Sequence, residues 1–416
     1  HGFDEIVVTL AFLPQAITTY FGDGSEFGVQ MHYATELSPL GTAGSVRNAM
    51  EHLDERFLVI SGDVLTDIDL SAIWATHVEK EALATIGLTP VDNPLEFGIV
   101  ITREDGTIER FLEKPSWGQV FSDTINTGIF VLEPEIFDYI EAGRPVDFSS
   151  EVFPKLLEDG RPLYGAVARG YWEDVGTLGA YVTAHKDILD AKVAVDIPGF
   201  RLADGVWLGE GSEIDPTAVI EGPALIGQNC RIGPGVRVGE YAVLGANVRV
   251  RQNADLERVV IHDNAYIGES TRLRGTVVGR ACDLRKGVRC EDGSVLGDEC
   301  FVAEEAFIGA DVKIYPFKTV ESGAVINSSI VWESKGARSL FGRNGVVGLA
   351  NVDVTPEVAT RLALAFATTL KVDSTVVTSR DSSRSARMLK RAIMAGLNAG
   401  GINVIDLEVA SVPVTR

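Results

Sequence analysis

The stretch Ile214–Leu256, IDPTAVIEGPALIGQNCRIGPGVRVGEYAVLGANVRVRQNADL, decides the fold of the middle of the chain. Every sixth residue in it is a branched aliphatic: Ile214, Ile220, Ile226, Ile232, Val238, Leu244, Val250 and Leu256. The residue four places after each of these is small or β-branched: Ala218, Ala224, Cys230, Val236, Ala242, Val248, Ala254 and Val260. A period of six with one large and one small inward residue predicts a triangular solenoid, in which three hexads make one coil.

The pattern continues beyond this stretch. Its phase slips near Val260 and again near Leu273, and it then resumes as Val278, Leu284, Cys290, Leu296, Val302, Ile308, Ile314 and Val320. The companion series runs through Cys282, Val288, Ser294, Cys300, Ala306 and Val312, before Lys318 breaks it. We therefore expect one solenoid over residues 200–330. The pattern resembles the left-handed parallel β-helix of hexapeptide-repeat proteins, and the left hand is implied by that resemblance alone.

Charge and cysteine content narrow the function. The chain of 416 residues has a formal net charge of −22, and so acidic a surface repels nucleic acid and anionic lipid. No apolar run approaches the ~20 residues needed to cross a bilayer, so we expect neither nucleic acid nor membrane as a partner. All four cysteines lie in the repeat region without a CxxC pair, which favours reduced, buried thiols in a cytoplasmic protein over a zinc site.

Residues 1–195 alternate strand and helix patterns, which predicts a Rossmann-like α/β domain with helices on both faces of its sheet. Ligands of such sheets bind beyond the carboxyl ends of the strands. The predicted helices include Thr42–His52 and Ser71–Glu79. The predicted strands are Glu5–Leu10, Val29–Ala34, Arg56–Ser61, Ala84–Thr89, Ile99–Thr102 and Gly128–Leu132.

Two aspartates are candidate metal ligands. Asp63 follows the apolar run Phe57–Ile60, and Asp174 stands before a glycine turn and a new helix. Carboxylates at strand ends suit a hard cation such as Mg²⁺, and two aspartates far apart in the sequence could converge on one ion. Each residue alone is equally well explained as a helix cap or turn residue.

Three further motifs suit a phosphorylated ligand. Glu36-Leu37-Ser38-Pro39-Leu40-Gly41-Thr42-Ala43-Gly44 predicts a helix start whose backbone N–H groups face a nucleotide. In Glu113-Lys114-Pro115 the carboxylate can accept sugar hydroxyls and the ammonium can pair with phosphate, although exposed ion pairs before a proline are common. Asn126-Thr127-Gly128 can hold a sugar hydroxyl or simply start a strand.

The order of these motifs, together with Phe97-Gly98, resembles that of the sugar-1-phosphate nucleotidylyltransferases along nearly all of residues 1–190. The resemblance implies that Asp63 and Asp174 hold Mg²⁺, and that Leu40, Gly41 and Thr42 contact the nucleoside of a nucleoside triphosphate. It implies a sugar 1-phosphate held by Gly98, Glu113, Lys114, Asn126 and Thr127, with Lys114 also counted among the catalytic residues.

The family's glycine-rich triphosphate loop would precede His1, so we expect both ends of the chain to be truncated. We also expect residues 1–416 alone to show little or no transferase activity.

Glu36 bears on the choice of nucleotide. Thymidylyl and uridylyl members of the family usually place glutamine five residues before the loop glycine, where this chain has Glu36. Guanine offers two neighbouring donors, N1–H and N2–H₂, which suit a carboxylate, whereas uracil and thymine suit an amide. This favours GTP, although Glu36 could also be a solvated turn residue.

Residues 335–416 predict a βαβ-like unit with helices Pro356–Leu370 and Ser383–Ala399 and strands Ser374–Thr378 and Ile402–Leu407. The unit resembles the first domain of phosphohexomutases through Phe341–Gly348, Val354–Glu357, Ser379–Ser383 and Val412–Arg416. The family's FGTDGIRG motif has an arginine where this chain has Val347, and the phosphoserine loop would follow Arg416. We therefore expect no mutase activity, and the pairing of modules favours mannose 1-phosphate as the sugar.

Other functions stay open at this stage. Glucose-1-phosphate thymidylyl-, uridylyl- or adenylyltransferases share the motifs. Hexapeptide β-helices also form acyltransferases with a histidine base, and His262 is the one histidine of the repeat region, although its place at a phase slip favours a corner residue. The chain could also be a non-catalytic regulatory subunit. In each case we expect a homo-oligomer assembled through the β-helix.

Overall fold

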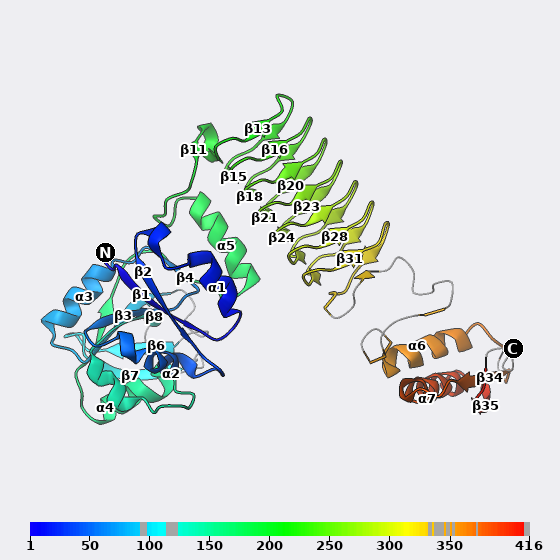
Figure 1. Cartoon of the computed structure of the whole chain (residues 1–416), viewed down its shortest axis with the longest axis horizontal. Coiled ribbons are helices and arrows are strands. Elements are labelled where there is room, and N and C mark those ends of the chain that lie inside the picture. The colour runs from blue at the N-terminus through cyan, green and yellow to red at the C-terminus, as the bar shows by residue number, and fades with distance from the viewer. Residues whose placement is uncertain are drawn as a thin grey trace. The chain divides into compact units, whose positions relative to one another are not determined.

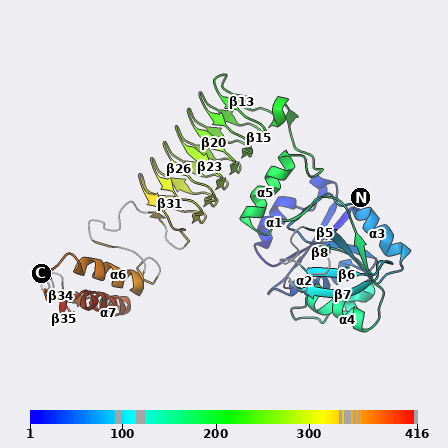
Figure 2. The same cartoon turned by 180° about the vertical axis from the view of Figure 1, so that it is seen from behind.

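The computed structural model describes residues 1–91, 98–113, 124–331, 335–336, 345–346, 350–351, 354–371 and 373–411. These residues form two compact units, His1–Asp196 and Ile197–Arg416. Figures 1 and 2 show the two faces of the chain, and each unit is described by itself.

A mixed sheet with strand order β7-β6-β8-β5-β9, and with β3 paired to β8, forms the centre of the first unit. The strand β5 (Ala84–Pro90) is buried along all but its last residue, because its apolar run is covered on both faces. The other strands are β3 (Phe57–Ile60), β6 (Gly98–Thr102), β7 (Ile108–Glu113), β8 (Thr124–Leu132) and β9 (Leu163–Val167).

Two smaller strand pairs accompany this sheet. β1 (Glu5–Leu10) and β2 (Gln30–Thr35) pair in parallel, so the loops after them leave the same edge. β4 (Val64–Thr66) and β10 (Trp172–Asp174) pair antiparallel. The predicted α/β character of residues 1–195 is therefore confirmed. The helices are α1 (Pro14–Phe21), α2 (Gly41–Asn48), α3 (Leu70–Glu79), α4 (Phe153–Glu158) and α5 (Leu178–Leu189).

Residues 206–326 form the predicted parallel β-solenoid, and the inward series of the hexads is its core. Stacked residues are spaced by one coil, so Ile214 lies opposite Ile232 and Ile232 opposite Val250. The phase slips also have a structural cause. Inward Ile261 follows Leu256 after five residues, and in the same way Val278 follows Leu273, so two sides of the triangle are one residue shorter.

Asparagines and glycines turn the solenoid corners, as shown by the positive φ of Asn229, Asn247, Asn253 and Asn264. His262 follows β21 (Val260–Ile261) at such a corner. The left hand of the helix stays a prediction.

The solenoid has three sheets. The first contains β11 (Phe200–Arg201), β12 (Val206–Leu208), β15 (Ala224–Ile226), β18 (Val243–Leu244), β21, β24 (Val277–Val278), β27 (Val295–Leu296) and β30 (Lys313–Ile314).

The second sheet contains β13 (Glu213–Ile214), β16 (Arg231–Ile232), β19 (Arg249–Val250), β22 (Tyr266–Ile267), β25 (Asp283–Leu284), β28 (Phe301–Val302), β31 (Thr319–Val320) and β33 (Lys335–Gly336). The third contains β14 (Val219–Ile220), β17 (Arg237–Val238), β20 (Asp255–Glu257), β23 (Arg272–Arg274), β26 (Arg289–Cys290), β29 (Phe307–Ile308) and β32 (Val325–Ile326).

The predicted βαβ unit near the C-terminus is present as α6 (Pro356–Ala367), β34 (Thr375–Arg380), α7 (Arg384–Ala399) and β35 (Asn403–Val409), with the two strands parallel. Helix α6 begins after Thr355 and α7 after Ser383, because each side chain accepts a backbone N–H of the first turn. Of the mutase-like motif, residues 341–344, 347–349 and 412–416 lie outside the described part of the chain.

Candidate nucleotide and sugar-phosphate site

The strand pair β4–β10 brings the two candidate metal aspartates together. Asp174 lies opposite Val64, the residue after Asp63, and the Val175 N–H donates to the Asp63 carbonyl over 2.8 Å. Both aspartate side chains are exposed. Their carboxylates therefore come from adjacent strands although more than one hundred residues separate them in the sequence.

The Asn126-Thr127-Gly128 motif packs against both of these segments. Gly128 has φ +73°, and a Cβ there would lie 2.6 Å from Ser61 Oγ, so only glycine fits. The Trp172 indole N–H donates to the Thr127 carbonyl over 2.9 Å, and the Ser61 N–H donates to the Gly128 carbonyl over 3.2 Å. Three of the sequence motifs thus share one backbone network.

This network also limits what Asn126 and Thr127 can do. The Thr127 side chain is buried and donates to the Gly87 carbonyl, so its hydroxyl proton is already used within the sheet. The Asn126 amide donates to Ser149 Oγ and its carbonyl oxygen accepts the Gly128 N–H. Both residues therefore hold the strand in place, and a direct side-chain contact with sugar stays a prediction.

The strands β6 and β7 bring the remaining sugar-phosphate candidates to the same end of the sheet. Gly98 lies opposite Glu113, and the next residue, Ile99, lies opposite Ile125 of β8. Gly98 thus lies next to the β8 segment that contains Asn126, and Glu113 lies one strand further along the sheet. Phe97 and Lys114 lie outside the described residues.

The turn before α2 is fixed by residues that the sequence did not single out. Ala43 and Gly44 N–H groups donate to the Val146 carbonyl over 3.0 and 3.1 Å, and Thr42 Oγ1 donates to Asp147 over 2.8 Å. The expectation that these N–H groups stay free for a phosphate is therefore wrong for Ala43 and Gly44. The physical reason is that the Val146 carbonyl lies against the start of the helix and accepts both N–H groups.

Glu36 is not a solvated turn residue. Its exposed fraction is 9%, and one carboxylate oxygen accepts the Leu40 N–H over 3.0 Å. A buried carboxylate needs partners for its other lone pairs. Glu36 is therefore tied to the turn before α2 through Leu40, and its carboxylate has further lone pairs that a ligand could use.

The carboxyl pKa values shift in opposite directions at the turn before α2 and on the strand β10. Burial raises the pKa of the Asp147 carboxyl, but hydrogen bonds from Ser150 and Thr42 outweigh it and hold that pKa below its ordinary value, so Asp147 stays an anion. Burial, reinforced by the charges of Asp187 and Asp174, raises the pKa of Glu173. The strand that carries Asp174 is thus a region of concentrated negative charge, which a bound cation would relieve.

The carboxylates Asp63 and Asp174 fit a hard divalent cation. No group of three or more His, Cys, Asp or Glu side chains that could hold a metal occurs within the described ranges. Mg²⁺ is typically held by one or two carboxylates and completes its shell with water and substrate phosphates. Two exposed aspartates on adjacent strands match that pattern.

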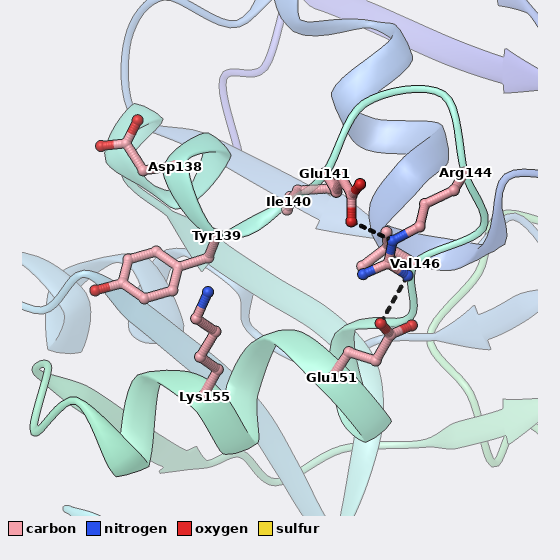
Figure 3. Close-up of a pocket in the computed structure, with 8 residues that line it drawn as sticks. All are labelled: Asp138, Tyr139, Ile140, Glu141, Arg144, Val146, Glu151 and Lys155. Carbon is pink, nitrogen blue, oxygen red and sulfur yellow. Dashed lines mark hydrogen bonds and ion pairs between the residues drawn. The ribbon is translucent and has the colours of Figure 1, made fainter.

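A hollow of this unit lies away from these residues, and Figure 3 shows its lining. Arg144 donates to Glu141 over 2.6 Å and to Glu151 over 2.8 Å, and the Lys155 ammonium lies 5.6 Å from the centre of the Tyr139 ring. Arg144, Glu141, Glu151 and Lys155 thus already have partners, and none of the site residues predicted from the sequence lines the hollow. The Arg144 ion pairs link the loop that carries Val146 to Glu151.

Comparison with known proteins identifies the family. The model of the Nucleotidyl transferase family matches residues 1–191. A UTP--glucose-1-phosphate uridylyltransferase of Synechocystis is 36% identical over 304 residues, covering 69% of this chain and 78% of that protein. The chain belongs to the nucleotidyltransferase family. The GMPPB C-terminal domain model matches residues 220–331, and the phosphoglucomutase/phosphomannomutase alpha/beta/alpha domain I model matches residues 338–416.

Two further relatives of this nucleotidyltransferase are named for a different activity. A mannose-1-phosphate guanylyltransferase of Mycobacterium tuberculosis is 35% identical over 260 residues, covering 62% of this chain and 71% of that protein. A mannose-1-phosphate guanyltransferase of Candida albicans is 32% identical over 342 residues, covering 79% and 88%. Nucleotidyltransferases of this family use a divalent metal. Among the residues that the structure describes, no helix is long and apolar enough to cross a membrane.

Proposed function

We propose that this nucleotidyltransferase, in its complete form, transfers a guanylyl group from GTP to mannose 1-phosphate, with Mg²⁺, giving GDP-mannose and pyrophosphate. The observation that carries the proposal is the convergence of Asp63, Asp174 and the Asn126–Gly128 strand, to which the buried Glu36 before α2 is added. Relatives named as guanylyltransferases match this chain in sequence over 71% and 88% of their length.

In this reaction an oxygen of the sugar phosphate attacks the α-phosphate of GTP in line, and pyrophosphate leaves. Asp63 and Asp174 would hold Mg²⁺, which when bound offsets the charge of the phosphates. Glu36 would accept N1–H and N2–H of guanine, while Leu40, Gly41 and Thr42 hold the nucleoside. Gly98, Glu113, Lys114 and Asn126 would hold the sugar phosphate, with Thr127 as a positioning residue. The protein acts mainly by alignment and charge neutralisation.

The competing substrate pair is UTP and glucose 1-phosphate, for which the Synechocystis relative is named. Uracil presents a single donor between two acceptors, so a carboxylate beneath the base would face a carbonyl oxygen. A buried Glu36 with a 9% exposed fraction therefore favours guanine over uracil.

Product binding tests the metal half of the proposal. GDP-mannose is titrated into the protein with Mn²⁺ as a spectroscopic probe, and the metal is followed by electron paramagnetic resonance. Asp174→Asn is expected to lower Mn²⁺ affinity in the presence of GDP-mannose at least tenfold. The matched control Asp54→Asn removes an exposed aspartate of the same unit and is expected to change nothing. Equal Mn²⁺ affinity in Asp174→Asn and wild type would remove Asp174 from the site.

Turnover by the complete gene product tests the substrates. GTP with mannose 1-phosphate and UTP with glucose 1-phosphate are compared by pyrophosphate release. The guanylyl pair is expected to react at least ten times faster. Faster reaction of the uridylyl pair would overturn the proposed specificity while leaving the nucleotidyltransferase assignment intact.

Because all four cysteines are free and buried, we also propose that the protein works in a reducing compartment, the cytoplasm.

A further inference from the structure

A second hollow, of about 260 Å³, opens on the solenoid. Its lining residues lie between Arg251 and Glu304, far in the sequence from the transferase motifs. Its lining combines cationic, amide and carboxylate groups from consecutive coils: Arg251, Gln252, Glu269, Arg285, Lys286 and Glu304. In a chain of net charge −22, this hollow gathers three cations beside two carboxylates.

The stacking of the coils places these groups. The Arg251 N–H donates to the Ile267 carbonyl, and the Gly268 N–H donates to the Leu284 carbonyl, each over 2.8 Å. Arg251, Gly268 and Arg285 therefore occupy the same corner of three successive coils. Since neighbouring strands lie about 4.8 Å apart, the backbones of the two arginines are about 10 Å apart, with one residue between them.

That middle residue has to be glycine. A Cβ on Gly268 would lie 2.5 Å from the carbonyl carbon of Arg285, which no side chain tolerates. Glycine at this position therefore lets the coils pack closely, and it places no side chain between Arg251 and Arg285 in the lining of the hollow.

Arg285 is fixed in position in the lining of the hollow. Its guanidinium lies 5.7 Å from the Tyr266 ring centre and 5.3 Å from that of Phe301, and it donates to an Asp283 oxygen over 2.8 Å. The other Asp283 side-chain oxygen is buried and has no hydrogen-bond partner among the described residues. An arginine held by two rings and one carboxylate loses little further rotamer freedom when it binds an anion.

The other two cations are available to a ligand. In the described part of the chain, no carboxylate lies within ion-pair distance of Arg251. Lys286 pairs with Glu269 at 3.4 Å, where the Lys286 side chain is 58% exposed and the Glu269 side chain 36% exposed. Exposed pairs of this kind are worth little and exchange readily for a stronger anion.

We propose that this hollow binds a phosphate monoester of a hydroxylated compound such as a sugar, with Arg251, Arg285 and Lys286 contacting the phosphate. Gln252, Glu269 and Glu304 would then hydrogen-bond the hydroxyl groups. A nucleotide fits less well, because Arg285 already covers a face of both nearby rings and a base would have to stack there. None of the residues that line this hollow belongs to the predicted transferase site.

Calorimetric titration of the whole chain tests this, with EDTA present so that metal-dependent binding elsewhere is silent. The probes are inorganic phosphate, glucose 6-phosphate and GMP. We expect one glucose 6-phosphate site per chain, weaker binding of inorganic phosphate, and weaker binding still of GMP. Arg251→Gln and Arg285→Gln should each weaken glucose 6-phosphate binding about tenfold, the size of one charge-assisted hydrogen bond.

Arg272→Gln is the matched control, because Arg272 is an exposed arginine on a different sheet of the same solenoid. It is expected to bind like wild type. Arg251→Gln leaves the rings and Asp283 untouched, so its effect cannot come from loss of the Arg285 contacts. Absence of glucose 6-phosphate binding at millimolar concentration, equal affinity in Arg251→Gln and wild type, or preference for GMP would each overturn the proposal.

Discussion

Glu36→Gln is the substitution that tests most directly how the base is selected. The amide keeps an oxygen that can accept the Leu40 N–H, which now binds the carboxylate over 3.0 Å, so the turn before α2 should keep its shape. The change therefore falls on the other carboxylate oxygen, which we propose accepts hydrogen bonds from the base. A hydrogen bond to a charged group contributes about 1.5–3 kcal/mol, and replacing it with a donor adds repulsion against guanine N1–H.

Since about 1.4 kcal/mol corresponds to a factor of ten, the substitution should weaken GDP-mannose binding between roughly tenfold and one hundredfold. UDP-glucose binding should be unchanged or tighter. Both are measured by calorimetry on the wild-type chain, on Glu36→Gln and on the control Glu55→Gln, an exposed glutamate of the same unit. If Glu36→Gln is folded and binds GDP-mannose as wild type does, the carboxylate serves only to cap the turn and our reasoning about guanine is refuted.

Four other outcomes are expected. Gly128→Ala should lower the stability of the first unit more than Gly143→Ala does in calorimetric melting: both have positive φ, which costs about 1–2 kcal/mol, but only the Gly128 Cβ meets another atom, at 2.6 Å. Burial lowers the pKa of His77 from 6.5, so its contribution to stability is present above that pH and is lost as the pH falls; His77→Gln should flatten this dependence in urea melts at pH 7 and pH 5. A thiol reagent should label none of the four buried cysteines until the solenoid unfolds, and labelling in the native state would contradict their burial. Sedimentation should show the self-association through the solenoid that the sequence predicts, and a monomer at all concentrations would contradict it.

The solenoid could be predicted from the sequence because its contacts repeat at fixed sequence distances. Each inward residue packs on the residue one coil away, so the hexad period is itself the contact map. Even the phase slips mark real coils that are one residue shorter. The βαβ unit of residues 354–411 was equally readable, because Thr355 and Ser383 cap its helices locally.

The candidate site was only partly readable. The order of motifs pointed to Asp63 and Asp174, yet the sequence could not show that β4 and β10 pair, because that contact spans more than one hundred residues and has no local signal. For the same reason Asp147, which anchors Thr42, and Trp172, which binds the Thr127 carbonyl, were missed as supports of the site. The sequence predicts that Thr127 helps to hold the sugar phosphate but could not show that its side chain is buried in the sheet, and the sugar contact stays a prediction.

The sequence by itself determined the features that depend on local periodicity and local chemistry: the solenoid, the α/β class of residues 1–195, and the residue types able to bind metal and phosphate. Tertiary structure alone decided which of those residues meet, which hydrogen bonds they have already used, and that Glu36 is buried beneath its loop. The physical reason is that a side chain's availability depends on its neighbours in space, and in an α/β sheet those neighbours come from distant parts of the chain.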